Sequence, residues 1–470
     1  MQSDERLRPK VGLLALTLEL YETLAPDLRA GREGWLRREV LPALEPVADV
    51  TFSGAVFRRR DVEEAVAGFE AAGVDALLVM LLAYSPSQIS LPALKCTHLP
   101  IIVWNTQELF AVDEGFTGTA MVDNHGVHGT QDLCNVLLRA GVKFEYVTSH
   151  LSDEGATVGL ADFFAAAAAV SRLRSARLGL LGYPFPGMGD FALDTTHMVA
   201  TLGCEWTILS LEDYILRAAD AGPAEVEALV AEYRDTYNVA DSLTDGDLEA
   251  TARVELALRG MVREHDLDAL TYQFMAFGQD ERTPTVPFVA ASRLMAEGVG
   301  FGGEGDLIAA AATAFLNWLN PPASFTEIFT MDFGGNSVLL SHMGEANVAM
   351  ARSDRKIPMV ARPTPITRTR GRQLALVTSF EPGPATLCVL TLGPGGRWRL
   401  IATTGTIADY GPLPAMQVPH CKLITDGDVR EFLTAYAKAG GPHHSGLCFG
   451  DARPLLRQAA RMLDADLCEV

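Results

Sequence analysis

A glycine-rich and apolar stretch near residue 300 contains two carboxylates and an imidazole that could hold a divalent cation. Glu304 lies in a glycine-rich turn before an Ala/Leu-rich run that predicts a helix, so a tight backbone would carry its carboxylate. Glu327 and His342 flank two apolar runs of strand character that are joined by Gly334 and Gly335. Carboxylate oxygens together with imidazole nitrogens suit a borderline-hard cation such as Mn²⁺.

The glycine pair predicts a two-residue hairpin turn between these strands. Counting outward from that turn makes Glu327 and His342 direct cross-strand partners. Their Cβ atoms would then lie about 5 Å apart on one face of the hairpin, close enough to share a cation. A three-residue loop would shift this register by one residue.

Two neighbouring imidazoles, His443 and His444, offer a fourth ligand about a hundred residues further along the chain. Successive side chains of an extended backbone point to opposite faces, so only one of the two is expected to bind the cation. Taken singly, Glu304, Glu327 and His342 also fit a loop acid, a surface acid and a core histidine. The predicted cross-strand pairing favours the metal site over this ordinary interpretation.

The glycines of residues 298–303 match the GxGxxG pattern of a dinucleotide site. A predicted helix precedes them where a strand is required, and Glu304 would repel a pyrophosphate at that turn. We therefore do not assign nucleotide binding to this segment and treat it as a loop.

Strands and helices alternate through the first two thirds of the chain. Patterns of buried strands occur at VGLLALTLELY, DALLVMLL, LPIIVWNT, ARLGLLG and LDALTYQF, with helical patterns such as DVEEAVAGFEAAG between them. This alternation predicts βαβ units with parallel sheets. Short alternating strands with Gly/Pro turns follow from about residue 325 and predict a mainly β domain.

The predicted fold is therefore α/β, with two doubly wound, Rossmann-like α/β domains followed by a β-rich C-terminal domain. We place the N-terminal domain at residues 1–175, the central domain at 176–324 and the β-rich domain at 325–470. Glu304 belongs to the central domain, whereas Glu327, His342 and His444 belong to the β-rich domain.

Composition limits the partners of this 470-residue chain. Its formal net charge is −21, and no basic cluster exceeds Arg58–Arg60, which argues against nucleic acid and anionic membrane surfaces. A small or neutral ligand is expected instead. Seven scattered cysteines without a CxxC pair predict reduced thiols in a cytoplasmic protein, and no apolar run reaches transmembrane length.

Four motifs resemble the L-arabinose isomerase family, which is related to L-fucose isomerase. They are GFGGEGD around Glu304, SFTEIFTMDF around Glu327, SHMGE around His342 and GGPHHS around His444, with weaker similarity at VHGTQD, LLAYSPSQ and LYE. The resemblance implies that these four residues bind Mn²⁺, or another divalent metal such as Co²⁺ or Mg²⁺. It also implies that the two glutamates move the proton.

The same resemblance implies a homotrimer or homohexamer with active sites between subunits, to which Tyr21 and His128 contribute. We expect substrate contacts from Tyr21, His128, Met188 and His443; Met188 lies in a Pro/Gly-rich loop at a predicted strand end. Leu18 stands where the family has glutamine, TMDF replaces TYHF, and the hairpin is two residues shorter. These departures predict a sugar pocket that differs from the one for L-arabinose.

These observations predict a metal-dependent aldose–ketose isomerase, an intramolecular oxidoreductase acting on a pentose or deoxyhexose through a cis-enediol. Glu304 and Glu327 would serve as base and acid in the proton transfer. One alternative is a metal-dependent epimerase or lyase on a sugar or sugar acid, since enediolate formation also begins those reactions. Another is a non-catalytic sugar-binding protein, although binding alone would not need two carboxylates facing a cation.

Overall fold

The computed structural model describes residues 7–411 and 413–470 as two compact units, Leu7–Ser171 and Arg172–Val470. Each unit contains a parallel sheet with helices, and the second also contains a β-rich barrel. The predicted α/β fold with a β-rich C-terminal part is confirmed, whereas the doubly wound arrangement and the boundaries at 175 and 324 stay predictions. Within the described residues, no helix combines the length and apolarity needed to cross a bilayer.

The Leu7–Ser171 unit is built on a five-stranded parallel sheet with the order β2-β1-β3-β4-β5. Its strands are β1 (Lys10–Leu16), β2 (Asp49–Thr51), β3 (Ala76–Leu81), β4 (Ile101–Asn105) and β5 (Glu145–Thr148). Strand β3 is buried throughout, which explains its continuous apolar run. Strand β5 was not predicted, because its four residues are only partly apolar and mostly half-buried.

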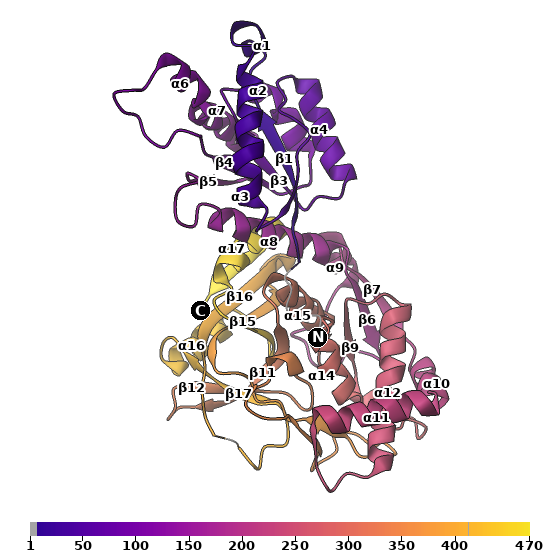
Figure 1. Cartoon of the computed structure of the whole chain (residues 1–470). Coiled ribbons are helices and arrows are strands. Elements are labelled where there is room, and N and C mark those ends of the chain that lie inside the picture. Colours follow the sequence, from indigo (N-terminus) through magenta and orange to yellow (C-terminus); the bar gives the residue numbers. More distant parts are fainter. Residues whose placement is uncertain (1–6, 412) are drawn as a thin grey trace. The chain divides into compact units, whose positions relative to one another are not determined.

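Helices surround this sheet (Figure 1). They are α1 (Tyr21–Leu24), α2 (Leu28–Trp35), a π-helical turn (Leu36–Val40), α3 (Leu41–Leu44), α4 (Arg59–Ala71), a 3₁₀ turn (Ser87–Ile89), α5 (Leu91–Cys96), α6 (Gly118–Asp123) and α7 (Gly126–Arg139). Helix α8 (Val158–Arg174) continues into the second unit's sequence. The strand order reverses direction between β1 and β3, and open α/β sheets bind ligands at such a point.

The Arg172–Val470 unit begins with a four-stranded parallel sheet of order β10-β9-β6-β7. Its strands are β6 (Arg177–Leu181), β7 (Glu205–Leu209), β9 (Ala269–Tyr272) and β10 (Gly300–Gly302). Its helices are α9 (Thr195–Leu202), α10 (Leu211–Asp220), α11 (Pro223–Thr236), α12 (Asp245–Glu264), α13 (Phe274–Phe277), α14 (Phe288–Ala296) and α15 (Leu307–Leu319). A small sheet of order β14-β13-β8 joins β8 (Asn238–Val239), β13 (Pro358–Ala361) and β14 (Leu374–Leu376).

The segment around residue 300 forms an edge strand, so the predicted loop is wrong at β10. Glycine hid this strand because it lacks the branched or aromatic side chains that mark strands in a sequence. Glycine is required in this strand because the start of α15 approaches it closely. A Cβ atom on Gly302 would lie 2.3 Å from the backbone oxygen of Asp306.

The β-rich part is a closed six-stranded barrel of order β15-β18-β11-β12-β17-β16, in which β15 also pairs with β16. Its strands are β11 (Ala323–Asp332), β12 (Ser337–Ser341), β15 (Gly383–Leu392), β16 (Trp398–Ile407), β17 (His420–Thr425) and β18 (His444–Phe449), and β19 (Asp466–Glu469) joins β16 in parallel. Helices α16 (Val429–Lys438) and α17 (Arg453–Leu463) and 3₁₀ turns at Val348–Met350 and Pro394–Gly396 complete it.

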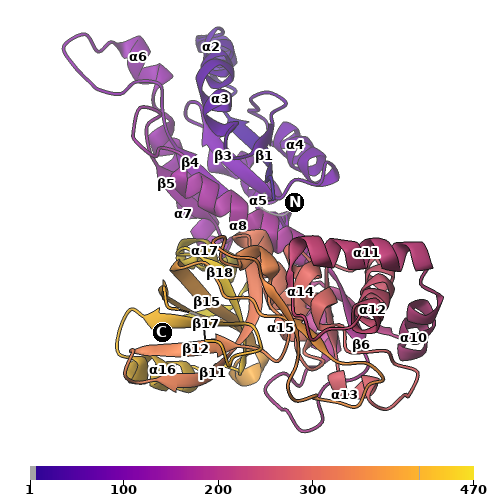
Figure 2. The same cartoon turned by 60° about the horizontal axis from the view of Figure 1, so that its bottom comes forward.

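Helix α15 lies between the parallel sheet and the barrel (Figures 1 and 2). It contacts β10, β9 and β6 on one side and β18, β11 and β15 on the other. Nearly all of its residues are buried, as expected for a helix that is apolar on every face. The turn before α15 is therefore held where the sheet and the barrel meet.

The predicted cross-strand pairing of Glu327 with His342 is wrong, as the β11–β12 hairpin shows. Its ladder ends at Asp332 opposite Ser337, around a four-residue turn centred on the glycine pair, and this matches the predicted register near the turn. The register then shifts by one residue between Ile328 and Thr330. Glu327 consequently faces Ser341 on β12, because the irregularity inserts one extra residue into β11.

Candidate metal centre

Glu304 lies on a strained turn between β10 and α15. Its φ is +60°, and that of Gly305 is +86°, so two consecutive residues are left-handed. This conformation is uncommon outside glycine and is characteristic of functional sites. The turn is fixed by Thr271 of β9, whose hydroxyl accepts a 3.0 Å hydrogen bond from the Gly305 backbone N–H. Phe185, in the loop after β6, donates its N–H to the Glu304 carbonyl at 2.9 Å.

Four side chains from this turn and from the barrel converge. Glu304, Glu327, His443 and His444 each offer one ligand atom, and these atoms all lie within 4.8 Å of one another. The Nε2 atom of His444 lies 3.1 Å from Glu327 Oε1 and 3.7 Å from Glu304 Oε2. Glu327 and His444 are directly opposite on β11 and β18, so the barrel ladder sets their separation.

His342 lies beside this group without belonging to it. Its Nε2 atom is 3.5 Å from Glu327 Oε1, and its side chain is buried. The Phe325 ring meets the His342 and His444 rings edge-on, with centroid distances of 4.8 and 5.0 Å. The structure thus brings the four predicted ligands to one region and adds His443 to it.

The prediction that His443 and His444 point to opposite faces is wrong. Strand β18 begins at His444, so His443 precedes the extended ladder, and the two ring centroids are only 4.1 Å apart. The Nε2 atom of His443 approaches Glu304 Oε2 to 3.8 Å. Both imidazoles therefore face the same carboxylate.

Each of the three histidines is oriented by a carboxylate. The pairs, with their distances from Nδ1 to oxygen, are His342–Glu345 at 2.6 Å, His443–Asp190 at 2.5 Å and His444–Asp306 at 2.8 Å. An acceptor on Nδ1 places the proton there and turns Nε2 toward the centre, as carboxylates do for metal-binding histidines. The Tyr272 hydroxyl, at the end of β9, donates to Glu345 in turn.

Sequence reasoning missed these three carboxylates. Asp306 and Glu345 lie within three residues of a predicted ligand and inside the quoted motifs, which is a signal that could have found them. Asp190 lies two residues after the predicted substrate contact Met188, but no local pattern links it to His443, because 253 residues separate the two.

The carboxylates and imidazoles of the cluster stabilise one another's charged forms. Burial raises the pKa of Glu304, but the imidazoles of His443 and His444 outweigh this effect and lower that pKa to about 2. Burial lowers the pKa of His444, yet its contacts with Asp306, Glu304 and Glu327 raise that pKa well above the usual value. Glu304 is therefore a carboxylate at neutral pH.

Three of these atoms are orphaned. Glu304 Oε2, His443 Nε2 and His444 Nε2 are buried and form no hydrogen bond with any residue that the structure describes; the short His444–Glu327 separation lacks hydrogen-bond geometry. Buried polar atoms almost always have a partner, so each unpaired one requires an explanation. Orphaned oxygen and nitrogen donors that converge fit a divalent cation.

The predicted substrate contacts divide between the two units. Tyr21 and His128 belong to the Leu7–Ser171 unit, whereas Met188 and His443 belong to the Arg172–Val470 unit. The Tyr21 hydroxyl lies 2.6 Å from His125 Nε2, and the His128 ring centroid lies 5.0 Å from that of His125. His125, which stands with His128 in the motif DNHGVHG, is thus a further polar residue of this cluster.

Three family models of known proteins match successive parts of the chain. Residues 192–320 match the L-arabinose isomerase central domain, residues 322–466 its C-terminal domain, and residues 41–174 the N-terminal domain of fucose/sulfoquinovose isomerase. All three family models thus describe domains of sugar isomerases. The chain belongs to the L-arabinose isomerase/L-fucose isomerase-like family, of which it is a divergent member.

Individual relatives show how far the chain has diverged. It is 28% identical to the L-arabinose isomerase of Acidothermus cellulolyticus over 85% of this chain and 81% of the relative. It is 27% identical to the L-arabinose isomerase of Mycolicibacterium smegmatis over 82% of this chain and 78% of the relative. It is also 27% identical to the L-arabinose isomerase of Nocardioides sp. over 87% of this chain and 82% of the relative.

The strained turn generates a test of its role. Gly305→Ala places a Cβ atom 2.6 Å from Tyr183 O and Pro184 Cα, whereas Gly298→Ala, also at positive φ, meets only Asn317 at 3.5 Å. We expect Gly298→Ala to lose about 1–2 kcal/mol of unfolding free energy from left-handed strain. Gly305→Ala should lose about 1–3 kcal/mol more through overpacking.

Urea unfolding followed by circular dichroism measures this difference. Gly298→Ala is the matched control, because it shares the backbone strain without the clash. Equal losses in the two variants would show that the loop after β6 does not constrain the Glu304 turn.

Proposed function

We propose that this protein is a metal-dependent aldose–ketose isomerase that acts on a pentose or deoxyhexose through a cis-enediol. The observation that carries this proposal is the convergence of Glu304, Glu327 and His444. Two of the converging atoms, Glu304 Oε2 and His444 Nε2, are buried and have no hydrogen-bond partner among the described residues. Family membership supports it, since the relatives compared above are named L-arabinose isomerases. The N-terminal match to a fucose/sulfoquinovose isomerase domain supports a substrate other than L-arabinose.

In this proposal Glu304 and Glu327 move the proton between C1 and C2 of the sugar. One carboxylate removes a proton from the carbon next to the carbonyl and becomes protonated, and the other, already protonated, donates its own proton to the neighbouring carbon. Glu304 is well suited to a fixed position, because two left-handed residues and the Thr271 hydroxyl hold its backbone.

We further propose Mn²⁺, or another divalent metal such as Co²⁺ or Mg²⁺, as the cofactor, with Glu304, Glu327, His342 and His444 as its ligands. The cation would act as a Lewis acid that stabilises the charge developing on the sugar oxygens. Glu345 and Asp306, the buried carboxylates beside His342 and His444, keep the Nε2 atoms of these histidines aimed at this region.

Tyr21, His128, Met188 and His443 are proposed to bind the sugar hydroxyls and carbon chain. Tyr21 and His128 lie in the Leu7–Ser171 unit. We therefore propose a homotrimer or homohexamer in which these two residues complete the site of a neighbouring subunit.

Product analysis tests the function directly. We expect NMR to show ketose formed from at least one sugar in a panel of pentoses, 6-deoxyhexoses, sulfonated sugars and sugar acids with Mn²⁺. In D₂O, deuterium should enter C1 of the ketose during turnover, because the donated proton comes from an exchangeable carboxyl group. Glu304→Gln and Glu327→Gln should each lower kcat by at least about 10²–10⁴-fold, the usual contribution of acid–base catalysis.

Each other outcome identifies a different protein. Inverted stereochemistry or carbon–carbon cleavage would show an epimerase or lyase, and saturable binding without products would show a sugar-binding protein. Near-normal turnover by Glu304→Gln would remove that residue from the mechanism.

Metal removal gives a second test. Dialysis against EDTA should abolish turnover and lower the thermal midpoint, and Mn²⁺ should restore both. A ligand present at 100 times its Kd stabilises the folded state by about 2.7 kcal/mol. Titration calorimetry with Mn²⁺ should show one site per chain in the native protein and strongly weakened binding in His444→Gln. Full activity after exhaustive chelation would exclude metal dependence.

A further inference from the structure

We propose that Asp190 is a positioning residue that sets the ring orientation of His443 for contact with the sugar, without controlling cation affinity. This inference rests on the proposed function. It adds Asp190 to the site, in the loop between β6 and α9 that also carries Met188.

Asp190 holds His443 through two contacts. Its Oδ2 atom accepts the backbone N–H of His443 at 3.1 Å and lies 2.5 Å from the Nδ1 atom of the same residue. A carboxylate only accepts hydrogen bonds when ionised, so Nδ1 carries a proton. Nε2 is thereby left facing Glu304 Oε2, 3.8 Å away, with no hydrogen-bonding partner among the described residues.

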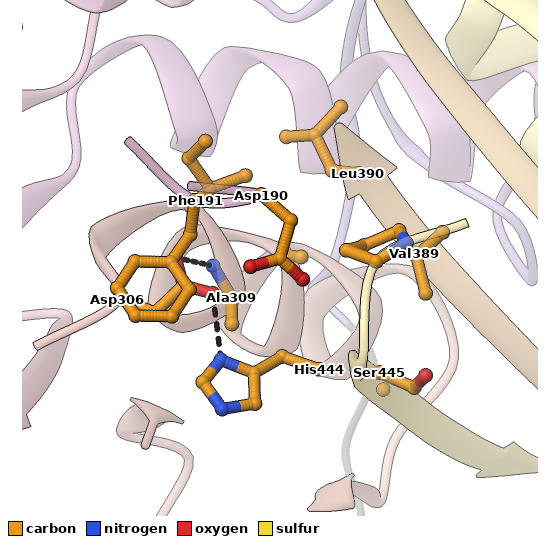
Figure 3. A pocket seen from close by; sticks show the side chains of 12 residues that line it. Asp190, Phe191, Asp306, Ala309, Val389, Leu390, His444 and Ser445 are labelled. Atoms are coloured by element: carbon orange, nitrogen blue, oxygen red, sulfur yellow. Dashed lines mark hydrogen bonds and ion pairs between the residues drawn. The ribbon is translucent and has the colours of Figure 1, made fainter. Parts of the chain in front are cut away.

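The loop that carries Asp190 is itself fixed to the centre. The next residue, Phe191, is buried and stacks on His444, with centroids 5.2 Å apart and ring planes at 13°. Figure 3 shows Asp190, Phe191, Asp306 and His444 around a cavity of about 10 Å³, the space that one water molecule needs. Earlier in the loop, Phe185 donates to the Glu304 carbonyl.

Exposure separates the two neighbouring carboxylate–imidazole pairs. The side chains of His444 and Asp306 are 1% and 3% exposed, whereas those of His443 and Asp190 are 37% and 38% exposed. An exposed ion pair contributes little to stability, so the effect of the Asp190 contact is orientation. An incoming sugar can approach the partly exposed ring of His443, whose Nε2 atom is itself buried beside Glu304, while His444 is enclosed.

The experiment compares two isosteric substitutions. Asp190→Asn offers an amide N–H to Nδ1, which favours the tautomer with the proton on Nε2. We expect kcat/KM to fall about 10–100-fold, mainly through KM, with Mn²⁺ affinity by calorimetry unchanged. Asp306→Asn, the matched change at His444, should instead weaken Mn²⁺ binding about 10–100-fold. In Asp190→Glu, which keeps the carboxylate, KM should return most of the way to its native value.

A control lies in the same loop. Asp194 caps α9 by accepting from the N–H groups of Thr196 and His197, and asparagine caps a helix equally well. Asp194→Asn should therefore leave kcat, KM and Mn²⁺ affinity unchanged, which separates the Asp190 effect from a general change in the loop.

A spectroscopic readout keeps this inference distinct from the proposed function. Selective ¹⁵N-histidine labelling with Mg²⁺ reports which nitrogen of His443 carries the proton, and His443→Gln assigns the signal. If the native protein turns over no sugar, the proposed function fails, while a changed His443 tautomer in Asp190→Asn still supports the positioning role. An unchanged tautomer, or loss of Mn²⁺ affinity matching that of Asp306→Asn, would overturn it.

Discussion

Asp306 is the residue on which the geometry of the centre depends. Its Oδ1 atom accepts the backbone N–H of Ala309 at 2.9 Å and so caps α15, while its Oδ2 atom binds His444 at 2.8 Å. The first contact belongs to the helix that packs on the parallel sheet, and the second reaches a strand of the barrel. The Asp306 carboxylate is therefore held in place at the start of α15, and it in turn fixes the position of the His444 imidazole.

Two further contacts repeat this relation between sheet and barrel. Tyr272, at the end of β9, binds Glu345, which holds His342, and Asp190, after β6, holds His443. In each case a residue at the carboxyl edge of the sheet orients a histidine of the barrel, directly or through one carboxylate. Ligands bind at this edge in open α/β sheets, and here the barrel supplies the nitrogen donors.

This dependence explains which parts of the structure the sequence could predict. Strands such as β1 and β3 could be predicted from their long apolar runs, because burial on both faces of a sheet leaves an unbroken apolar pattern. The motif around Glu304 indicated a tight backbone, and the left-handed φ of Glu304 and Gly305 confirms it. These features are local, so neighbouring residues suffice to define them.

The features that were missed depend on distant parts of the chain. The hairpin register was correct near its turn and failed beyond Phe329, because one extra residue in β11, between Ile328 and Thr330, shifts the pairing of β11 with β12. Barrel closure was not predicted, since it requires β15 to pair with β16 as well as with β18. The Asp190–His443 contact likewise joins two loops that only the folded sheet and barrel bring together.

Burial also distinguishes the parts of the centre that can change from those that cannot. His342 and His444 are buried, and each is paired with a buried carboxylate, Glu345 or Asp306. Removing one member of such a pair leaves an uncompensated charge in a poorly solvated place, which is strongly destabilising. His443 and its partner Asp190 are partly exposed, so changes there cost little stability. A chain that keeps its buried donors can therefore vary more freely at the partly exposed residues of the centre. Stability therefore constrains the buried pairs His342–Glu345 and His444–Asp306 more strongly than the partly exposed pair His443–Asp190.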